Sequence, residues 1–480
     1  MISKHVYLSI RSEELRLQVR DLLSRAGFAC RPAGAETARV SAAGAACIHI
    51  LDGMPQEPSP ATGYCARILI TSLSWDQAEA AAHRAGAITY ISRSRLRSDL
   101  APWLRFVHAL LALSGPEECR EPSADEALQP HTSAVSGGLA VVANPAYAAA
   151  VFTTTGDSQS GGQRWFMANC HGNPGFAAGS RRLLQTASAC VSEPPDLTRL
   201  CNLLNRWFKR IDRHMAFIGG IMPAGSRDMY MISAGQFIAI LLNRSHGHIK
   251  HLRRLKLNAE LGHATELWRK PDVLPLTFPQ DWLLFAANGK VVLTDQTRLQ
   301  MFNIWRKRFA ESTPPYALVD LPERMRRLLP VEYIGPVALF AMTRAAPNEA
   351  YLRIPADLQA VAGLVKAVGA VITELTGNSS LATSGEFLTA EWANNVILHG
   401  LPAKTPSAII CHIAAGGELA LTYYDWAKEW QPPAAADTPA ANDASLSGRG
   451  MAIIHSLTKS FSRRRIGPLN ISRFVLKNQA

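Results

Sequence analysis

Three polar residues in the C-terminal part of the chain are spaced for chemistry on one helix face. Glu391, Asn395 and His399 follow one another at intervals of four, and each such step turns an α-helix by only about 40°. Further along, residues 447–450 read Ser-Gly-Arg-Gly. An acid can accept a hydroxyl proton, an amide oxygen can hold magnesium, and glycines let a backbone approach phosphates. The pattern therefore suits a nucleotide site, although three polar residues alone are more often a solvated helix face.

Length and composition limit the classes of protein to consider. The chain has 480 residues, an apolar fraction of 48% and a formal net charge of +12, which predict about three domains with ample cores. No stretch approaches the roughly eighteen apolar residues of a membrane span, and the N-terminus lacks the order of a secretion signal. The basic runs are short and accompany no nucleic-acid motif. We therefore expect a cytoplasmic protein that binds neither membranes nor nucleic acid directly and whose charge can serve an acidic protein partner.

The eight cysteines are scattered along the chain. None belongs to a C-x-x-C pair or to a short Cys/His cluster of the zinc-ligand type, so we expect them to be reduced and buried. They are Cys30, Cys47, Cys65, Cys119, Cys170, Cys190, Cys201 and Cys411.

Residues 1–115 alternate short apolar runs with helical stretches. This pattern predicts a parallel sheet covered by helices on both faces. Asp52 ends one apolar run, Thr71 ends the next, and Arg93 follows a third. Because active groups in such folds lie at the carboxyl ends of the strands, these residues are the candidates for a site there.

This arrangement resembles a response-regulator receiver domain, whose fold is flavodoxin-like. In that family an aspartate is phosphorylated, a Thr or Ser contacts the phosphate, and a Lys pairs with it. The resemblance implies that Asp52 is the possible phosphoacceptor, with Thr71 and Arg93 beside it. The family also has acidic residues after the first strand, whereas residues 9–12 here read Ser-Ile-Arg-Ser. We therefore expect a degenerate receiver that serves as an interaction or dimerisation module; the alternative is a working phosphoacceptor.

Residues 116–137 are polar and rich in Pro, Ser and Gly, which predicts a linker. Residues 138–346 then show strand-like runs around two expected helices, 177–187 and 197–212, a pattern typical of an α+β or sandwich fold. The motifs of this stretch, in order, are Gly-Asp at 156–157, Ala-Asn-Cys-His-Gly-Asn-Pro at 168–174, Ala-Gly-Gln at 234–236 and Ala-Asn-Gly at 287–289.

These motifs resemble the 2C-type metal-dependent serine phosphatase of bacterial partner-switching regulators, an α/β sandwich. Two divalent metals in such a site need several carboxylates. Asn169 and Asn288 replace two of the family's carboxylates, and Ile-Gly at 334–335 stands where the family has Asp-Asp. Asp157 remains as an insufficient residual ligand. The resemblance therefore implies a pseudophosphatase that holds no metal and serves as a scaffold, and the alternative is an active phosphatase.

Residues 347–480 carry the opening motif in a third region. Asp425 ends a strand-like run, where it can accept a hydrogen bond from an exocyclic amine such as that of adenine. The glycine turn at 448–450 opens a helix whose free N–H groups can bind an anion. The expected elements are strands 350–354, 408–413, 418–424 and 470–476, and helices 356–375 and 387–399, the second capped by Gly400.

The order of these motifs resembles the ATP-binding α/β sandwich of anti-sigma-factor serine kinases, which belong with histidine kinases and gyrase to the GHKL (Bergerat) ATPases. The resemblance covers residues 350–480. It implies a catalytic base at Glu391, a magnesium ligand at Asn395 and an adenine contact at Asp425. It also implies a phosphate loop formed by Gly448, Arg449 and Gly450.

Two details of this region qualify the assignment. Ala427 stands where the family has a glycine, which implies a loss of backbone freedom beside the base pocket. His399 is interpreted as a structural residue at the end of its helix. A working kinase and a nucleotide-binding pseudokinase both remain open.

Taken together, the resemblances imply a bacterial regulator of transcription that works by partner switching and combines a receiver of the two-component type with a phosphatase and a kinase. Its cofactors would be ATP and Mg²⁺, both in the C-terminal region. Its partners would be a sigma factor or an anti-sigma-factor antagonist, and such kinases commonly form homodimers. The alternative is an inactive binding module that sequesters these partners with nucleotide only structural; a weaker alternative is an active serine phosphatase.

Overall fold

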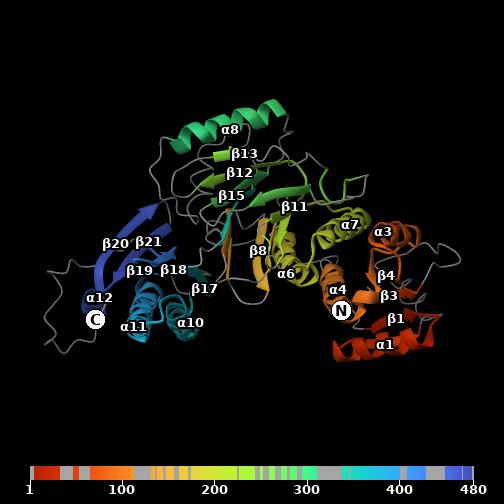
Figure 1. The fold of residues 1–480 in the computed structure, drawn as a ribbon, viewed down its shortest axis with the longest axis horizontal. Coiled ribbons are helices and arrows are strands. Elements are labelled where there is room, and N and C mark those ends of the chain that lie inside the picture. Colours follow the sequence, from red (N-terminus) through yellow and green to blue (C-terminus); the bar gives the residue numbers. More distant parts are fainter. Residues whose placement is uncertain are drawn as a thin grey trace.

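The chain forms a mixed α/β and α+β protein, as predicted, and its elements are described in three successive regions (Figure 1). The C-terminal region lies at one end of the molecule, the N-terminal region at the other, and the middle region between them. The computed structural model describes residues 5–32, 47–52, 65–112, 131–135, 138–143, 148–155, 162–170, 174–223, 226, 228–243, 249–251, 259–264, 272–277, 282–288, 295–310, 338–344, 348–400, 408–428, 449–466 and 469–477.

The N-terminal region is a parallel sheet in the order β2-β1-β3-β4-β5, which is the flavodoxin-like order. Its elements are β1 (His5–Ser9), α1 (Glu13–Arg25), β2 (Ala29–Pro32), β3 (Cys47–Asp52), β4 (Cys65–Thr71), α3 (Trp75–Arg84), β5 (Thr89–Ser92), the 3₁₀ turn η1 (Arg93–Arg95) and α4 (Leu96–Ala112). The strand-helix alternation predicted this sheet but not β2. That strand is short, lies at the sheet edge and ends in a proline, a residue that edges tolerate.

The middle region contains two antiparallel sheets, in the orders β14-β11-β10-β9-β8 and β13-β12-β15-β16-β7-β6. The strands are β6 (His131–Val135), β7 (Gly138–Ala143), β8 (Ala148–Thr155), β9 (Gly162–Asn169), β10 (Ala216–Met222), β11 (Asp228–Ala234), β12 (Phe237–Asn243), β13 (Ile249–His251), β14 (Asp272–Thr277), β15 (Trp282–Asn288) and β16 (Ala338–Arg344). Strand β6 falls inside the predicted linker 116–137 and pairs with β7. The second sheet therefore begins before the boundary that the composition indicated.

Helices α6 (Pro174–Cys190) and α7 (Pro194–Arg210) correspond to the two helices predicted for this region, and α8 (Asp295–Ala310) lies along its outer side (Figure 1). Helix α6 packs against α4 of the N-terminal region. One hydrophobic cluster consequently runs without interruption from Trp103 on α4 to Leu184 on α6 and Leu200 on α7. The first two regions share a core, so they are not independent folding units in the described part of the chain.

The C-terminal region is an antiparallel sheet in the order β17-β18-β19-β21-β20. Its elements are β17 (Glu349–Pro355), α10 (Leu358–Thr376), α11 (Ser379–Asn395), the π-helical turn η3 (Val396–Gly400), β18 (Ala408–Gly416), β19 (Glu418–Asp425), α12 (Arg449–Leu457), β20 (Thr458–Ile466) and β21 (Leu469–Leu476). The buried side chains of the helices share one core with those of the strands, including Trp392 of α11 and Phe474 of β21.

Helix α11 begins eight residues before the position predicted for it, at Ser379 instead of Phe387. The Asn378 side chain accepts hydrogen bonds from the backbone N–H groups of Ser380 and Leu381 and so caps the first turn. Gly377, with φ of 67°, ends α10 in the left-handed conformation. Gly377 thus ends α10, and Asn378 directly after it starts α11.

Among the described helices, α10 alone is long and apolar enough by length and composition to cross a membrane, with a mean hydropathy of 1.5 over its most apolar window. Its buried residues Val361, Leu364, Val368 and Ile372 pack in the core of the C-terminal region. Its pairing with α11 and its contacts with β17 and β18 explain this apolar character.

Candidate functional site

Helix α11 places Glu391 and Asn395 on one flank, as their spacing predicted. Trp392 and Ala393 are fully buried in the domain core, whereas Glu391 and Asn395 are only half-buried. The helix changes to a π-helical turn at Val396, directly after Asn395. Such turns are uncommon and occur frequently at functional sites.

The first turn of α12 closes against this flank through Gly450. A Cβ atom built at residue 450 would lie 2.6 Å from Oε2 of Glu391 and 3.4 Å from Nδ2 of Asn395. Only a glycine permits this approach without displacing the carboxylate. Of the predicted phosphate loop, Gly448 and the side chain of Arg449 lie outside the described residues, and Arg449 begins α12. The structure thus brings Glu391, Asn395 and Gly450 together at a helix start that can offer N–H groups to an anion.

Asp425 lies at the end of β19 and is 1% exposed. Its Oδ1 accepts hydrogen bonds from Nδ2 of Asn470 at 2.7 Å and from the backbone N–H of Ala427 at 3.0 Å. Its Oδ2 is buried and has no donor among the described residues. Burial raises the pKa of Asp425, and the hydrogen bond from Asn470 and the charge of Arg463 offset part of that rise. A buried carboxylate oxygen without a donor is costly unless a ligand supplies one, and the exocyclic amine of adenine has the right chemistry.

The segment after Asp425 connects the carboxylate to the end of α11. The backbone N–H of Lys428 donates to the carbonyl of Gly400 at 2.7 Å. A Cβ at residue 400 would lie 2.6 Å from that of Ala427, so the glycine is required for close approach. The helical segment ends at Gly400, the residue predicted to cap it, but without the left-handed conformation common at such ends, because Gly400 is absent from the described residues with positive φ.

The expected cost of Ala427 in place of glycine does not arise in the backbone. Among the described residues other than glycine, only Asp212 has a positive φ, so Ala427 occupies a region open to any residue. Ala427 is buried, and its carbonyl accepts hydrogen bonds from Asn470 and Arg465. The alanine therefore fits the turn that carries Asp425.

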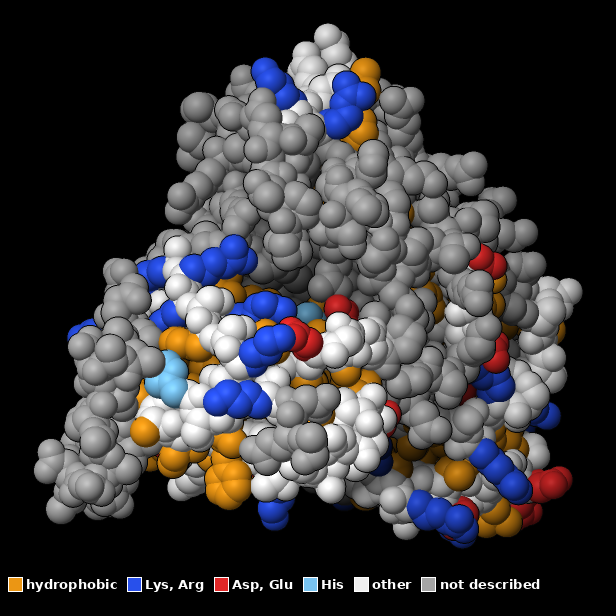
Figure 2. Space-filling view, turned by 60° about the vertical axis from the view of Figure 1, so that its left-hand side comes forward, with side chains coloured by type: hydrophobic (Ala, Val, Ile, Leu, Met, Phe, Trp, Pro, Cys, Tyr) orange, Lys and Arg blue, Asp and Glu red, His pale blue; other side chains and the backbone are white. Residues whose placement is uncertain are grey.

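His399 lies in the π-helical turn, and its side chain is exposed. This placement agrees with a helix-end position. Figure 2 shows Lys and Arg side chains interspersed with hydrophobic ones over the surface of the C-terminal region.

The candidate residues of the middle region are only partly described. Asn169 ends β9 and is completely buried. Asn288 ends β15, but its side chain lies outside the described residues, as do Asp157 and residues 334–335. Within the described part of the chain, no group of three or more His, Cys, Asp or Glu residues is placed to hold a metal.

In the N-terminal region, Asp52 and Arg93 meet at the carboxyl edge of the sheet. Arg93 donates from Nη2 to Oδ1 of Asp52 at 2.7 Å, across the end of β4. Thr71 ends β4, is 9% exposed, and accepts from the backbone N–H of Leu73. Arg93 therefore pairs with Asp52 at this edge of the sheet.

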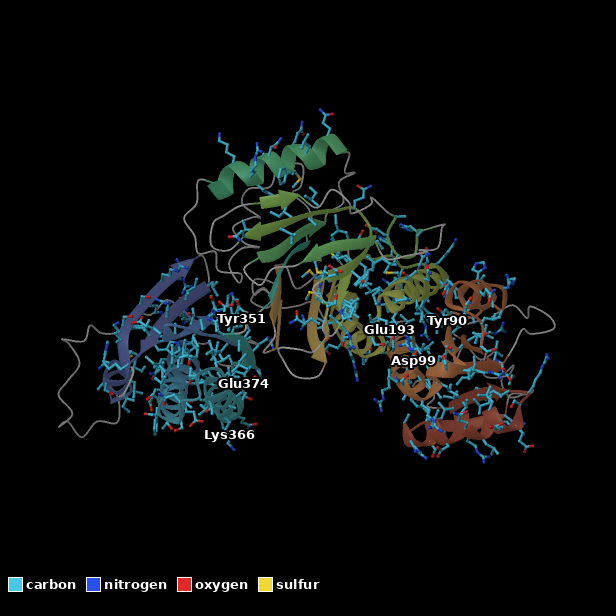
Figure 3. The ribbon with its side chains drawn as sticks, viewed as in Figure 1. Tyr90, Asp99, Glu193, Tyr351, Lys366 and Glu374 are labelled. Carbon is cyan, nitrogen blue, oxygen red and sulfur yellow. The ribbon has the colours of Figure 1, made fainter. Side chains whose placement is uncertain are left out.

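A junction of arginines, which the sequence reasoning missed, fixes α7 to the N-terminal region. Arg199 is 3% exposed; it donates to Oδ2 of Asp99 at 3.3 Å and to Oγ1 of Thr89 at 3.1 Å. Arg206 pairs with Glu79 at 2.6 Å. Tyr90, Asp99 and Glu193 mark this junction in Figure 3.

Arg95, from the turn that follows β5, extends the same junction. It donates to Oδ2 of Asp196 at 3.2 Å and to Oγ of Ser192 at 2.8 Å. This surface of the N-terminal region therefore contacts another region of its own chain. The spacing of Arg199, Arg206 and Arg210 along one face of α7 was the available signal.

Comparison with known proteins supports the assignment of the C-terminal region. Residues 354–474 match the family described as the histidine kinase-like ATPase domain, which confirms the resemblance predicted for that region. No curated protein matches the sequence.

Several solved structures are similar to the chain at low sequence identity. The RsbU and RsbW domains of Rv1364c from Mycobacterium tuberculosis are 15% identical, cover 72% of this chain and 97% of their own, and give a TM-score of 0.33. RsbX in complex with magnesium is 11% identical over 45% of this chain and 100% of its own, with a TM-score of 0.30. The PP2C phosphatase domain of SpoIIE from Bacillus subtilis, with a fragment of its regulatory domain, is 12% identical over 45% and 64%, also at 0.30.

Proposed function

We propose that the C-terminal region binds ATP and transfers its γ-phosphoryl group to a serine of an anti-sigma-factor antagonist, so that the chain regulates a sigma factor by partner switching. The observation that carries this proposal is the convergence of Glu391, Asn395 and Gly450 at the start of α12. The buried Oδ2 of Asp425, without a donor among the described residues, adds a position for the adenine amine.

Each residue has a chemical role in this proposal. Glu391 accepts the proton of the serine hydroxyl while the serine oxygen bonds to the γ-phosphorus. The bond from that phosphorus to the bridging oxygen breaks, and ADP leaves with the electron pair. The amide oxygen of Asn395 is suited to hold Mg²⁺, which when bound neutralises charge on the phosphates. The N–H groups at the start of α12 bind the phosphates, with Gly448 and Arg449 completing the loop.

The other two regions serve as scaffold in this proposal. Asn169 keeps the shape of a carboxylate at the end of β9 but not its charge, which favours a pseudophosphatase without bound metal. Asp157 alone would not hold two metals. Asp52 is a possible phosphoacceptor with Thr71 and Arg93 beside it, and the ion pair to Arg93 is the arrangement such a role needs. If the phosphatase is inactive, another protein must remove the phosphate that the kinase adds.

The proposed partners follow from the proposed regulation by partner switching. They are an antagonist protein, a sigma factor or both, and a second copy of the chain in a homodimer. We place the protein in the cytoplasm, with no nucleic acid and no membrane as direct partners.

The test is phosphoryl transfer from ATP labelled in its γ-phosphate to candidate antagonist proteins. Wild-type protein should label a serine, and Glu391→Gln should lower the rate by roughly 10²-fold or more while ATP binding persists. Glu374→Gln, an exposed glutamate on α10, is the matched control and should retain activity. Transfer that Glu391→Gln leaves intact would rule out the assigned base.

The second candidate is a binding module that sequesters a sigma factor or antagonist, with nucleotide only structural. The close approach of Gly450 to Glu391 is compatible with this module too, because a nucleotide can bind there without phosphoryl transfer. Measurable ATP binding without transfer to any partner would support this module. Residual phosphatase activity predicts manganese-dependent release of phosphate from a phosphoserine partner, and Asp157→Asn should abolish that release.

A further inference from the structure

The two oxygens of the Asp425 carboxylate have different surroundings. Oδ1 accepts two hydrogen bonds, from Asn470 and from the backbone of Ala427, whereas Oδ2 has no donor among the described residues. Asp425 and Asn470 are direct cross-strand partners in β19 and β21, and both are 1% exposed. The difference between the oxygens is therefore set by the sheet register and is independent of any ligand.

The Asn470 side chain has a partner for each of its polar groups. Its Nδ2 donates to Oδ1 of Asp425 at 2.7 Å and to the carbonyl of Ala427 at 3.0 Å. Its Oδ1 accepts from Nη1 of Arg465 at 3.0 Å. Because a guanidinium can only donate, this contact fixes which end of the amide faces the carboxylate. Arg465 is the cross-strand partner of Asn470 in β20, and the same Nη1 also donates to the carbonyl of Ala427 at 3.1 Å.

We propose that Asn470, oriented by Arg465, is a specificity-determining residue of the nucleotide site: it occupies Oδ1 of Asp425, leaves Oδ2 as an acceptor, and so selects a purine with a 6-amino group over one with a 6-oxo group. The inference rests on the proposed nucleotide site. A 6-amino group donates to Oδ2, whereas a 6-oxo group would bring a second acceptor against it. Sites that satisfy a buried polar group only with the correct ligand discriminate strongly against analogues that lack the donor.

The arrangement also explains why an amide, and not a carboxylate, occupies position 470. In Asn470→Asp, two carboxyl groups would meet at the 2.7 Å separation that the amide and carboxylate now have, and such a pair retains a proton. A proton on the Asp425 carboxyl can be donated from Oδ2. This variant should therefore accept a 6-oxo purine better than the wild type does.

The test compares ATP with inosine triphosphate, which differs at the 6-position of the base, by titration calorimetry on the full chain. Wild-type protein should bind ATP at least about 10²-fold more tightly. Asn470→Ala should reduce this ratio to within about tenfold, mainly by weakening the binding of ATP, because the carboxylate then loses the side-chain donor that holds Oδ2 as the free acceptor. Asn470→Asp should reduce the affinity ratio further by strengthening the binding of inosine triphosphate.

Arg465→Met keeps the test decisive if substitution of buried Asn470 unfolds the domain. It leaves Asn470 and Asp425 in place. The preference for ATP over inosine triphosphate should fall by roughly threefold, because the Asn470 amide loses the donor that orients it. Arg464→Met, at the exposed neighbouring position on β20, is the matched control and should leave the ratio unchanged.

The outcomes separate two failures. If wild-type protein binds neither nucleotide, the proposed nucleotide site and this inference both fall. If wild-type protein prefers ATP but Asn470→Ala and Arg465→Met weaken both nucleotides equally, the site stands and Asn470 has only a structural role.

Discussion

The arginine junction at α7 and the carboxylate site around Asp425 are both buried polar clusters, yet they treat charge in opposite ways. At the junction, Arg199 lies within 3.3 Å of Asp99 and 3.9 Å of Asp196, and its guanidinium stacks 3.8 Å from the Trp103 ring centroid. At the site, the hydrogen-bond donors to Asp425 are the neutral amide of Asn470 and the backbone of Ala427. The first cluster pairs buried charges with opposite charges. The second leaves one oxygen of a buried carboxylate, Oδ2 of Asp425, without a hydrogen-bond donor among the described residues.

Burial perturbs the pKa of the central group in both clusters. It lowers the pKa of Arg199 and raises that of Asp425, so each charged form is disfavoured by loss of water. Opposite charges within the junction offset that cost. One oxygen of Glu79 at the junction also lacks a donor, but that carboxylate already pairs with Arg206 at 2.6 Å. The unmet acceptor of Asp425 differs, because the hydrogen bonds to that carboxylate come only from neutral groups among the described residues, and it therefore indicates a ligand site.

The largest expected effect is at the junction. Arg199→Met removes the cation from between two buried carboxylates and should destabilise the protein by about 3–5 kcal/mol, because uncompensated buried charges are costly. Denaturant unfolding followed by tryptophan fluorescence measures this loss. Lys209→Met, exposed on the same helix, is the control and should change stability little. If Asp99→Asn fails to recover part of the loss in the Arg199→Met background, the ion-pair explanation is wrong.

Asp425→Asn should move binding and stability in opposite directions. It removes the acceptor for the adenine amine and should weaken the binding of ATP by about 1.5–3 kcal/mol, the contribution of a hydrogen bond to a charged group. The free protein should be as stable as the wild type or more so, because the substitution removes a buried charge whose cost Arg463 offsets only in part. Calorimetric titration measures the loss of ATP affinity, and thermal unfolding of the same samples measures the change in stability. Strong destabilisation of this variant would instead show that Asp425 has a structural role, like the carboxylates of the arginine junction.

Gly450→Ala should slow phosphoryl transfer by roughly tenfold, or about 1.4 kcal/mol in activation free energy, because its Cβ would lie 2.6 Å from Oε2 of Glu391 and displace the proposed base. Helix propensity alone would favour alanine by about 1 kcal/mol. Gly363→Ala on α10 is the matched control, since a Cβ at residue 363 would have nothing within 4 Å. That variant should gain stability with an unchanged rate of phosphoryl transfer, and equal transfer rates in the two variants would refute the close approach.

The pH dependence of ATP binding should follow Asp425. Because its pKa is raised from the ordinary value of 3.8, protonation begins at a higher pH than for an exposed aspartate, and ATP affinity should fall by up to about tenfold per unit below that pKa. The stability of the free protein has the opposite sign: the cost of the buried charge is present above the folded pKa and is removed as the pH falls through it. Asp425→Asn should lose both dependences, which separates them from titration of ATP itself.

The smallest expected effect is at the edge of the N-terminal sheet. Arg93→Ala breaks the 2.7 Å ion pair to Asp52, but the Arg93 side chain is 47% exposed, so the loss should be about 0.2–1 kcal/mol. Arg97→Ala, also exposed, is the control. A loss above about 2 kcal/mol would show that this pair is coupled through η1 to Arg95 and the junction.

Local sequence patterns predicted much of this protein. The strand-helix alternation of residues 1–115 predicted the flavodoxin-like sheet, and the four-residue spacing predicted the shared flank of Glu391 and Asn395. The early start of α11 could not be predicted as well, because Gly385 weakens the helical pattern. In the structure the side chain of Ile372 on α10 occupies the space beside Gly385, so a small residue there serves the packing of the two helices.

The sequence by itself determined the residue types at the candidate site, because helix periodicity and strand ends are local properties. Tertiary structure alone decided which carboxylates are compensated. Asn470 and Arg465 reach Asp425 through cross-strand register, and Arg199 reaches Asp99 through the packing of α7 on another region. Such contacts join residues far apart in the chain, so no local pattern records whether a buried charge is paired or left for a ligand.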